Sequence, residues 1–162
     1  MELYERYHLM LYHAAYGILK NRDDAQDAMQ EGMISAFEKL DQFKGEGDFG
    51  AWIRKIVVRK SIAYYRHNKR FVDELQFENH IELSESSEDD PNNFPSINSV
   101  QLTKAMAKLN HRYGLILKLY YLEGFTHMEI SDLLQCSYDN CRTILSRAKA
   151  QLKKKLNERT RD

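Results

Sequence analysis

Apolar residues recur at spacings of three and four along most of the chain, which is the period of a helix with one buried face. No segment shows the strict alternation of apolar and polar residues that predicts a strand. In the N-terminal half the pattern predicts one helix ending near Lys20 and a second capped by Asp23 or Asp24. A loop with three glycines, 41–50, precedes a third helix in 51–70. The chain is therefore predicted to be all-α.

The C-terminal half contains a second group of helices, whose ends are marked by capping residues. Two helices are predicted on either side of Asn110, and Gly124 occupies the position of a helix-ending glycine. Thr126 and Glu129 form a T-x-x-E capping box at the start of a short helix. After the turn Gln-Cys-Ser, Ser137 caps a long basic helix. A short capped helix, a tight turn and a longer basic helix predict a helix-turn-helix.

The segment between the two halves, 73–99, has a different composition. It contains eight acidic residues, no Lys or Arg, and both prolines of the chain. Its self-repulsion favours an extended conformation. We therefore expect two small helical domains, 1–72 and 100–162, joined by an acidic linker. The acidity either keeps the linker soluble or screens basic surfaces of the chain until a partner displaces it.

The formal net charge is zero, because 24 basic and 24 acidic residues cancel. The charge is nevertheless segregated along the chain. Residues 1–72 carry +2 (12 basic, 10 acidic), residues 73–99 carry −8, and residues 100–162 carry +6 (12 basic, six acidic). Such asymmetry indicates separate parts with separate partners.

The composition also limits the class of protein. A hydrophobic fraction of 43% is that of a folded chain. No apolar run approaches the about 20 residues of a membrane span, and the N-terminus lacks the layout of a signal peptide. Two cysteines are too few for a secreted disulfide framework. We therefore expect a cytoplasmic protein that does not insert into a membrane.

The sequence offers no pattern for catalysis or metal binding. Cys136 and Cys141 lack further ligands at a suitable spacing, and they fall at the N′ and N4 positions of the long helix. A hydrophobic staple across the start of that helix explains both cysteines. We find no nucleophile–base pair, no carboxylate pair and no Walker loop. We therefore expect no enzymatic activity, no metal and no cofactor.

The segment 51–70 contains seven basic residues and no acidic residue. Helical periodicity divides it into a basic face beside Trp52 and a face predicted to be buried. The basic face contains Lys55, Arg59, Arg66 and Arg70, and the buried face contains Ile53, Ile56, Val57, Ala63 and Tyr64. Exposed helix faces usually mix charges of both signs. The one-signed face favours contact with nucleic acid through phosphates and stacked bases, with a solvated face as the alternative.

The preceding loop, FKGEGDFG, carries aromatic residues at both ends. Phe43 and Phe49 could form the walls of a pocket for an unstacked base, because glycines between them allow close approach of the backbone. The alternative is a connector whose aromatic residues belong to the core.

The helix over 23–40 has two distinct faces. Its predicted buried face contains Ala25, Met29, Met33, Ala36 and Leu40. The other face is polar with an isoleucine at its centre, and contains Asp27, Gln30, Glu31, Ile34 and Glu38. This second face is either solvated or a docking surface for a protein partner.

The long C-terminal helix has a predicted buried stripe and an exposed start. The stripe contains Cys141, Leu145, Ala148, Leu152 and Leu156. The exposed first turns contain Asn140, Arg142, Thr143, Ser146 and Arg147, where a recognition helix contacts base edges and phosphates. A plain helical hairpin without DNA contact is the alternative.

These segments resemble bacterial RNA polymerase sigma factors of the extracytoplasmic-function group. Residues 25–67, with a D-x-x-Q-E helix, a loop and a Trp-led helix, resemble region 2 of the family. Residues 102–152, with E-G-F-T-x-x-E-I and L-S-R-A, resemble region 4. The chain departs from the family pattern at Arg59 and Ala63, at the start of the recognition helix, and at Ile144, where the family often has a basic residue.

The resemblance implies a factor that binds core RNA polymerase and directs promoter recognition, DNA melting and transcription initiation. The β′ clamp helices would bind Asp27, Gln30, Glu31 and Ile34, and the β flap would be a second contact. The −10 element would be read by Phe43, Lys44, Phe49, Trp52, Lys55, Arg59 and Arg66. The −35 element would be read by Asn140, Arg142, Thr143, Ser146 and Arg147. An anti-sigma factor is a frequent partner in the family.

Two other functions remain open at this point. A stand-alone helix-turn-helix regulator would bind duplex DNA site-specifically without polymerase. A sigma-like adaptor would bind only proteins, and replacement of Arg142 and Arg147 by alanine would leave its function intact.

Overall fold

The computed structural model describes residues 2–68 and 98–158, and all regular secondary structure within them is helical. The chain divides into two compact units, Met1–Ile81 and Glu82–Asp162. The predicted linker lies outside the described residues, except that Asn98 and Ser99 form the N-cap and the first residue of a helix.

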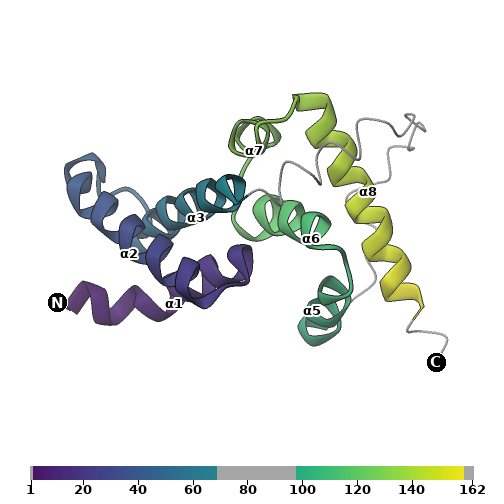
Figure 1. Ribbon diagram of the computed structural model, residues 1–162, viewed down its shortest axis with the longest axis horizontal. Helices are drawn as coiled ribbons and strands as arrows, with labels where there is room; N and C mark the ends of the chain where they lie inside the picture. Colours follow the sequence, from purple (N-terminus) through teal and green to yellow (C-terminus); the bar gives the residue numbers. More distant parts are fainter. Residues whose placement is uncertain (1, 69–97, 159–162) are drawn as a thin grey trace. The chain divides into compact units, whose positions relative to one another are not determined.

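Three helices build the N-terminal unit, and each packs against the other two: α1 (Glu2–Leu19), α2 (Arg22–Glu38) and α3 (Phe49–His67) (Figure 1). The first helix ends beside Lys20, as predicted. The predicted N-cap of α2 is wrong, because the Asn21 side chain accepts a hydrogen bond from the Asp24 backbone N–H at 3.0 Å. Asp23 and Asp24 instead occupy the first turn, where carboxylates interact favourably with the helix dipole.

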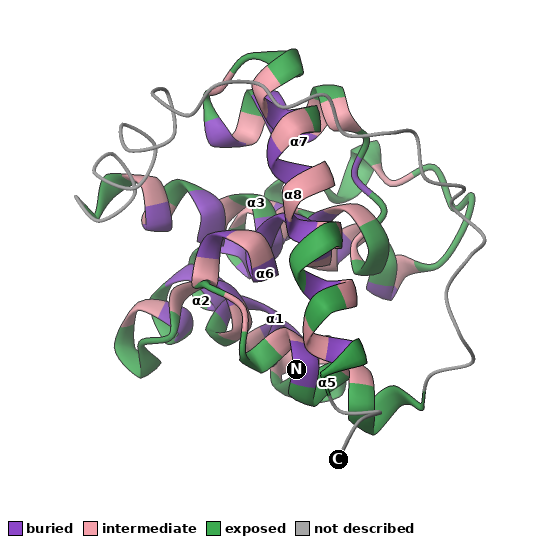
Figure 2. Ribbon diagram, turned by 90° about the vertical axis from the view of Figure 1, so that its right-hand side faces the viewer, coloured by how far each residue is buried: buried purple, intermediate pink, exposed green. Residues whose placement is uncertain are grey.

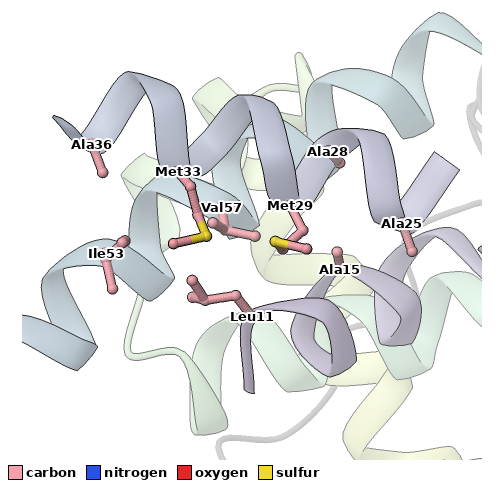
Figure 3. Close-up of a cluster of buried hydrophobic side chains, with 9 residues drawn as sticks. All are labelled: Leu11, Ala15, Ala25, Ala28, Met29, Met33, Ala36, Ile53 and Val57. Atoms are coloured by element: carbon pink, nitrogen blue, oxygen red, sulfur yellow. The ribbon is translucent and has the colours of Figure 1, made fainter. Parts of the chain in front are cut away.

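The core of this unit is a cluster of buried apolar side chains from all three helices (Figure 3). Its buried cluster consists of Leu11, Ala15, Ala25, Ala28, Met29, Met33, Ala36, Ile53 and Val57. A Cβ atom added at Gly32 would lie 2.7 Å from Val57 Cγ2 and 3.0 Å from Val57 Cα. The glycine therefore permits the close approach of α2 and α3.

Two predicted core positions are wrong. Leu40 is 45% exposed, because α2 ends at Glu38 and a short 3-10 turn, η1 (Leu40–Gln42), follows it. Ala63 is exposed, and α3 instead buries Val58, Ile62 and Tyr65. The reason is that α3 contacts both α1 and α2, so its buried arc is wider than a single stripe and is turned toward both neighbours.

The loop between α2 and α3 depends on its glycines. Gly45 and Gly47 have φ angles of 72° and 91°, a left-handed region that other residues rarely adopt. Asp48 then caps α3, because its carboxylate accepts hydrogen bonds from the backbone N–H groups of Gly50 and Ala51 at 3.2 and 3.3 Å.

The C-terminal unit is arranged around its last helix (Figure 1). Its elements are α5 (Ser99–Ala107), α6 (His111–Leu117), the π-helical segment η2 (Lys118–Leu122), α7 (His127–Leu134) and α8 (Tyr138–Asn157). α5, α6 and α7 all pack against α8. The predicted buried stripe of α8 is confirmed in full, and Ile144 is also buried at 1% exposure, so its apolar character serves the core. Figure 2 colours the helices by burial, and α8 carries both buried and less buried segments.

The helix-turn-helix is confirmed at every predicted boundary. Gly124 has a φ angle of 71°. Thr126 and Glu129 exchange two hydrogen bonds, from the Glu129 N–H to the Thr126 hydroxyl (3.2 Å) and from the Thr126 N–H to the Glu129 carboxylate (2.8 Å). Gln135 turns the chain in a left-handed conformation, and the Ser137 hydroxyl accepts a hydrogen bond from the Asn140 N–H at 3.1 Å.

The widening of the helix at η2 is not visible in the sequence pattern. The Glu123 N–H donates to the Lys118 carbonyl at 2.9 Å, which is a five-residue step rather than the four-residue step of an α-helix. Leu119 remains buried, whereas Tyr121 and Leu122 are exposed.

Candidate nucleic-acid interface

Three aromatic rings gather where the loop enters α3. The centroid of the Phe43 ring lies 5.3 Å from those of Phe49 and Trp52, and the Phe49 and Trp52 centroids are 5.5 Å apart. The Tyr7 ring of α1 lies 5.7 Å from Phe49. Each of the three rings is half-buried. Phe49 and Trp52 also pack against the core, and the three rings together present one aromatic surface where the loop enters α3.

The predicted basic face continues from this aromatic cluster along α3. Lys55 and Arg59 are exposed and Arg66 is half-buried, while Lys44 is exposed in the loop. Trp52 and Lys55 are three residues apart and therefore lie on neighbouring turns of the same face. Arg70 lies outside the described residues. The structure thus brings the predicted aromatic and basic residues of this region onto one helix and its N-terminal loop.

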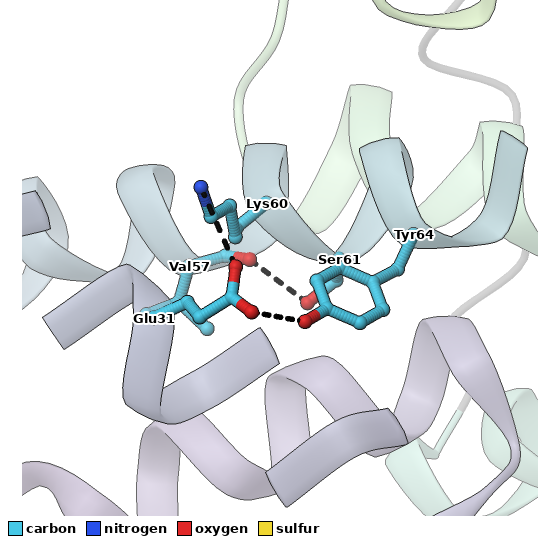
Figure 4. Close-up of polar contacts among 5 residues, drawn as sticks. All are labelled: Glu31, Val57, Lys60, Ser61 and Tyr64. Carbon is cyan, nitrogen blue, oxygen red and sulfur yellow. Dashed lines mark hydrogen bonds and ion pairs between the residues drawn. The ribbon is translucent and has the colours of Figure 1, made fainter. Parts of the chain in front are cut away.

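Glu31 of α2 is held by two residues of α3 (Figure 4). The Tyr64 hydroxyl donates a hydrogen bond to the Glu31 carboxylate, and the Lys60 ammonium lies 3.6 Å from the other carboxylate oxygen. The hydrogen bond to Glu31 is the main reason that the pKa of Tyr64 is raised to about 12, and burial and nearby carboxylates add to it. The acid-free segment 51–70 is therefore neutralised in part by a carboxylate from the neighbouring helix.

The other predicted docking residues of α2 are on the surface. Asp27 and Gln30 are exposed, and Ile34 is 58% exposed. Phe37 and Leu40 are also exposed, so the apolar part of this surface is larger than the single isoleucine that the sequence indicated. The sequence pattern placed Leu40 on the buried face, and its correct assignment to the surface would have indicated this larger apolar area.

The start of α8 presents the predicted recognition residues with different exposure. Arg142 is exposed, and Asn140, Thr143, Ser146 and Arg147 are half-buried. The Thr143 hydroxyl donates to the Asp139 carbonyl at 3.0 Å, so its oxygen can still accept a hydrogen bond. The Arg142 guanidinium lies 6.0 Å from the centroid of the Tyr138 ring, a cation–π distance.

An aromatic group beside these residues was not predicted from the sequence. The His127 ring lies 4.8 Å from Tyr120 and 6.0 Å from Tyr138, and the Lys149 ammonium lies 5.5 Å from the Tyr121 centroid. Burial, followed by the positive charges of Arg142 and Lys149, lowers the pKa of His127. The group joins η2, α7 and α8, and no spacing in the sequence reveals that these residues meet.

Among the described residues, no group of three or more His, Cys, Asp or Glu could hold a metal ion. In the same part of the chain, no helix combines the length and apolar character needed to cross a membrane.

Comparison with known proteins assigns both units. Residues 3–71 match the family Sigma-70 region 2, and residues 99–152 match Sigma-70, region 4. The chain is 29% identical over 139 residues to the RNA polymerase sigma factor SigV of Bacillus subtilis, which covers 85% of this chain and 78% of that protein. It is 25% identical over 163 residues to the ECF RNA polymerase sigma factor SigM of the same organism, covering 99% and 97%.

A solved structure shows the same fold. The sigma factor RpoE from Bartonella quintana, in complex with the anti-sigma factor NepR, superimposes with a TM-score of 0.51 at 20% identity, covering 96% of this chain and 95% of that one.

The chain therefore belongs to the sigma-70 family of RNA polymerase sigma factors, within its extracytoplasmic-function group. Members of this family are non-catalytic transcription initiation factors. The protein acts as a sigma factor that binds core RNA polymerase and directs promoter recognition and transcription initiation. A stand-alone regulator is not favoured, because the chain carries both region 2 and region 4.

Proposed function

We propose that the two units read two elements of one promoter while α2 binds the polymerase. The proposed division is a region 2 domain over 1–72, an acidic linker over 73–99 and a region 4 domain over 100–162. The observation that carries the proposal is that predicted contact residues of each unit cluster on a single helix and its entry, α3 in one unit and α8 in the other.

In the N-terminal unit the −10 element is bound as an opened strand. The aromatic surface of Phe43, Phe49 and Trp52 provides faces for unstacked bases. Lys44, Lys55, Arg59 and Arg66 neutralise the adjacent phosphates, which also favours melting of the duplex.

In the C-terminal unit the −35 element is bound as duplex in the major groove. The first turns of α8 present two arginines with three short polar side chains, the combination that reads base edges and fixes register on phosphates. Those five residues are Asn140, Arg142, Thr143, Ser146 and Arg147. The Tyr138 ring under Arg142 limits the freedom of the guanidinium before DNA arrives.

The polymerase surface is the exposed side of α2. Asp27, Gln30, Glu31 and Ile34 contact the β′ clamp helices, and Phe37 extends the apolar part of the contact. Because Glu31 is already bonded to Tyr64 and Lys60, its orientation is fixed before docking. The C-terminal unit contacts the β flap.

The remaining partners follow from the family. We propose an anti-sigma factor as a regulator, since the related RpoE of Bartonella quintana is in complex with one. The protein acts in the cytoplasm with polymerase, requires no cofactor and catalyses no reaction itself.

Transcription from core polymerase of the source organism, reconstituted with the purified chain on its genomic DNA, tests the proposal. We expect initiation at a defined set of promoters, found by sequencing the transcripts. Arg142→Ala/Arg147→Ala is expected to lower initiation from promoters with a −35 element at least tenfold, because two charged contacts to duplex DNA are lost.

The matched control is Lys104→Ala/Lys108→Ala, which removes two exposed positive charges from the same unit, on α5 and at its C-cap and not on α8. It is expected to retain initiation within about twofold. An equal loss of initiation in both double variants would mean that α8 contributes only positive charge and no specific contacts to the −35 element. Full activity of the arginine variant would favour an adaptor that binds only proteins, and site-specific duplex binding with no initiation would favour a stand-alone regulator.

A further inference from the structure

The turn of the helix-turn-helix contains a pair of cysteine side chains. Cys136 precedes the N-cap residue Ser137, and Cys141 lies one turn into α8. Both are free thiols, and they occupy the N′ and N4 positions of α8, which pack against each other across the start of a helix. Cys141 is fully buried at 0% exposure, whereas Cys136 is only half-buried. Solvent therefore reaches Cys136 and does not reach Cys141.

Backbone hydrogen bonds fix Cys136 in this position. Gln135 has a φ angle of 53°, and this left-handed residue directs the following N–H of Cys136 to the Ser131 carbonyl at 3.0 Å. On the other side, Ser137 is fixed by its capping bond to Asn140. The placement of Cys136 beside the first turn of α8 is therefore imposed by the turn and does not depend on a flexible loop.

The surroundings distinguish the two thiols chemically. The S–H of Cys141 donates to the Cys136 sulfur, which lowers the pKa of Cys136, and the buried guanidinium of Arg112 on α6 lowers it further against the opposing effect of burial. The same hydrogen bond and burial raise the pKa of Cys141. The pKa of Cys136 is therefore the lower of the two, which makes Cys136 the more reactive thiol of the pair.

We propose that Cys136 and Cys141 form a reversible oxidation site, in which a hydroperoxide oxidant converts the hydrogen-bonded thiol pair into an intramolecular disulfide. A hydrophobic staple accounts for two small apolar side chains at these positions. It does not account for a partly exposed sulfur that is hydrogen-bonded to a buried one beside a buried arginine.

The reaction takes place in two steps. The Cys136 thiolate attacks one oxygen of the peroxide, the O–O bond breaks, and a sulfenic acid forms while the leaving hydroxide takes up a proton to become water. The Cys141 sulfur then attacks the Cys136 sulfur, and an S–S bond replaces the S–O bond. The departing hydroxide takes the Cys141 proton and leaves as a second water. Two electrons pass from the thiols to the peroxide, and a dithiol reductant reverses the change.

The structural consequence falls on the start of the recognition helix. A disulfide brings the two sulfurs to about 2 Å, closer than any hydrogen-bonded contact. Cys141 is packed in the core and Arg142 follows it directly. Oxidation therefore shifts the first turn of α8, and its effect on DNA binding rests on the proposed function of that helix.

The chemical test uses the full chain in its reduced form, treated with hydrogen peroxide and then digested and analysed by mass spectrometry. We expect loss of both titratable thiols, a mass decrease of two hydrogens, and one peptide pair linking Cys136 to Cys141. Dithiothreitol is expected to restore both thiols. In Cys141→Ala the expected product is a sulfenic acid at Cys136, trapped by dimedone, because the resolving thiol is absent. In Cys136→Ser the buried Cys141 is expected to remain reduced.

Circular dichroism spectra that match the parent confirm that both variants are folded. As a readout free of mutation, amide exchange of the parent chain before and after oxidation should change at residues 138–142. Formation of only intermolecular disulfides, or equal oxidation of Cys141 in Cys136→Ser, would overturn the proposal.

Binding of the oxidised chain to a promoter recovered in the transcription assay is measured separately, with an expected loss of affinity of at least threefold. If the disulfide forms while the reduced chain supports no initiation, the oxidation site stands and the proposed function fails. If the reduced chain supports initiation and no disulfide forms, the proposed function stands and the oxidation site fails.

Discussion

The two units stabilise their basic helices by different contacts. In the N-terminal unit α3 lies close to α2 across Gly32, and a carboxylate from α2 neutralises Lys60. In the C-terminal unit two cations of α8 lie over aromatic rings, Arg142 over Tyr138 and Lys149 over Tyr121, while Lys155 pairs with Glu158 at the end of the helix. An exposed ion pair weakens as salt is added, whereas stacking on a ring also contributes through contact area.

The difference shows how each unit can present positive charge without losing stability. The N-terminal unit supplies acids from a neighbouring helix, so part of its basic segment is structural. The C-terminal unit has a single acid, Asp139, in the first turn of α8 and uses helix caps and aromatic rings for stability. Four experiments test this contrast, beginning with the largest expected effect.

Gly32→Ala should destabilise the N-terminal unit by about 1–3 kcal/mol, because the new methyl group meets the stiff Val57 side chain and its backbone. Urea denaturation followed by fluorescence measures it, since Trp52 is the only tryptophan of the chain and belongs to this unit. The control in the other unit is Gly114→Ala, where the nearest atom to a new Cβ is 3.9 Å away. Its expected effect, measured by circular dichroism, is neutral or stabilising by up to about 1 kcal/mol. A Gly32→Ala curve identical to the parent would mean that α2 and α3 separate without cost.

Thr126→Ala should destabilise the C-terminal unit by about 1 kcal/mol, because one partner of the capping box is removed at the start of α7. Amide exchange in α7 is expected to accelerate while exchange in α2 stays unchanged. Thr126→Ser keeps the hydroxyl and should resemble the parent. If the serine variant is as unstable as the alanine variant, the threonine methyl group and not the cap is responsible.

Lowering the pH should weaken the C-terminal unit before the N-terminal one. The pKa of His127 is lowered by burial and by Arg142 and Lys149, so the unfolded chain binds a proton that the folded chain resists. Stability is therefore complete above the ordinary histidine pKa of about 6.5 and falls as the pH drops through it. Thermal melts between pH 8 and 5 should show this loss in the parent and a smaller loss in His127→Gln. Equal slopes in both proteins would assign the effect to other groups.

Tyr64→Phe should have the smallest effect, a few tenths of a kcal/mol, because the lost hydrogen bond and the adjacent ion pair are largely exposed. The raised pKa of Tyr64, about 12, gives a more sensitive readout. The contribution of Tyr64 is present below pH 10 and is lost as the pH rises from 10 to 12, and ultraviolet titration should show one late-ionising tyrosine that the variant lacks. Its presence in Tyr64→Phe would assign that ionisation elsewhere.

Helix ends around the helix-turn-helix were predictable from sequence because caps are local, whereas the N-cap of α2 was misassigned to Asp23 or Asp24 instead of Asn21. Thr126, Ser137 and Gly124 each satisfy backbone groups within a few residues of themselves, so no tertiary information is needed. Buried faces were predictable only in part. The stripe of α8 was complete, whereas Ala63 was misassigned, because a helix wedged between two neighbours buries an arc that periodicity alone does not orient. Leu40 was misassigned because α2 ends before it, at Glu38.

The candidate sites also divide into features that local sequence predicts and features that depend on contacts between helices. The exposure of Arg142 and Ile34 could be read from their position opposite a buried stripe. The partners of Glu31 and the rings around His127 could not, because those contacts join residues on different helices. The roles of these surfaces in binding DNA and polymerase remain predictions.

The π-helical segment at Lys118–Leu122 has an evolutionary consequence. Its hydrogen bonds span five residues, so it accommodates one residue more than an α-helical path between the same end points. We therefore expect homologous chains that are one residue shorter at this place to run as a plain α-helix and still deliver Phe125 to the core. An insertion tolerated here would have moved Tyr120 and Tyr121 to new positions on the surface while leaving the downstream helix-turn-helix in register.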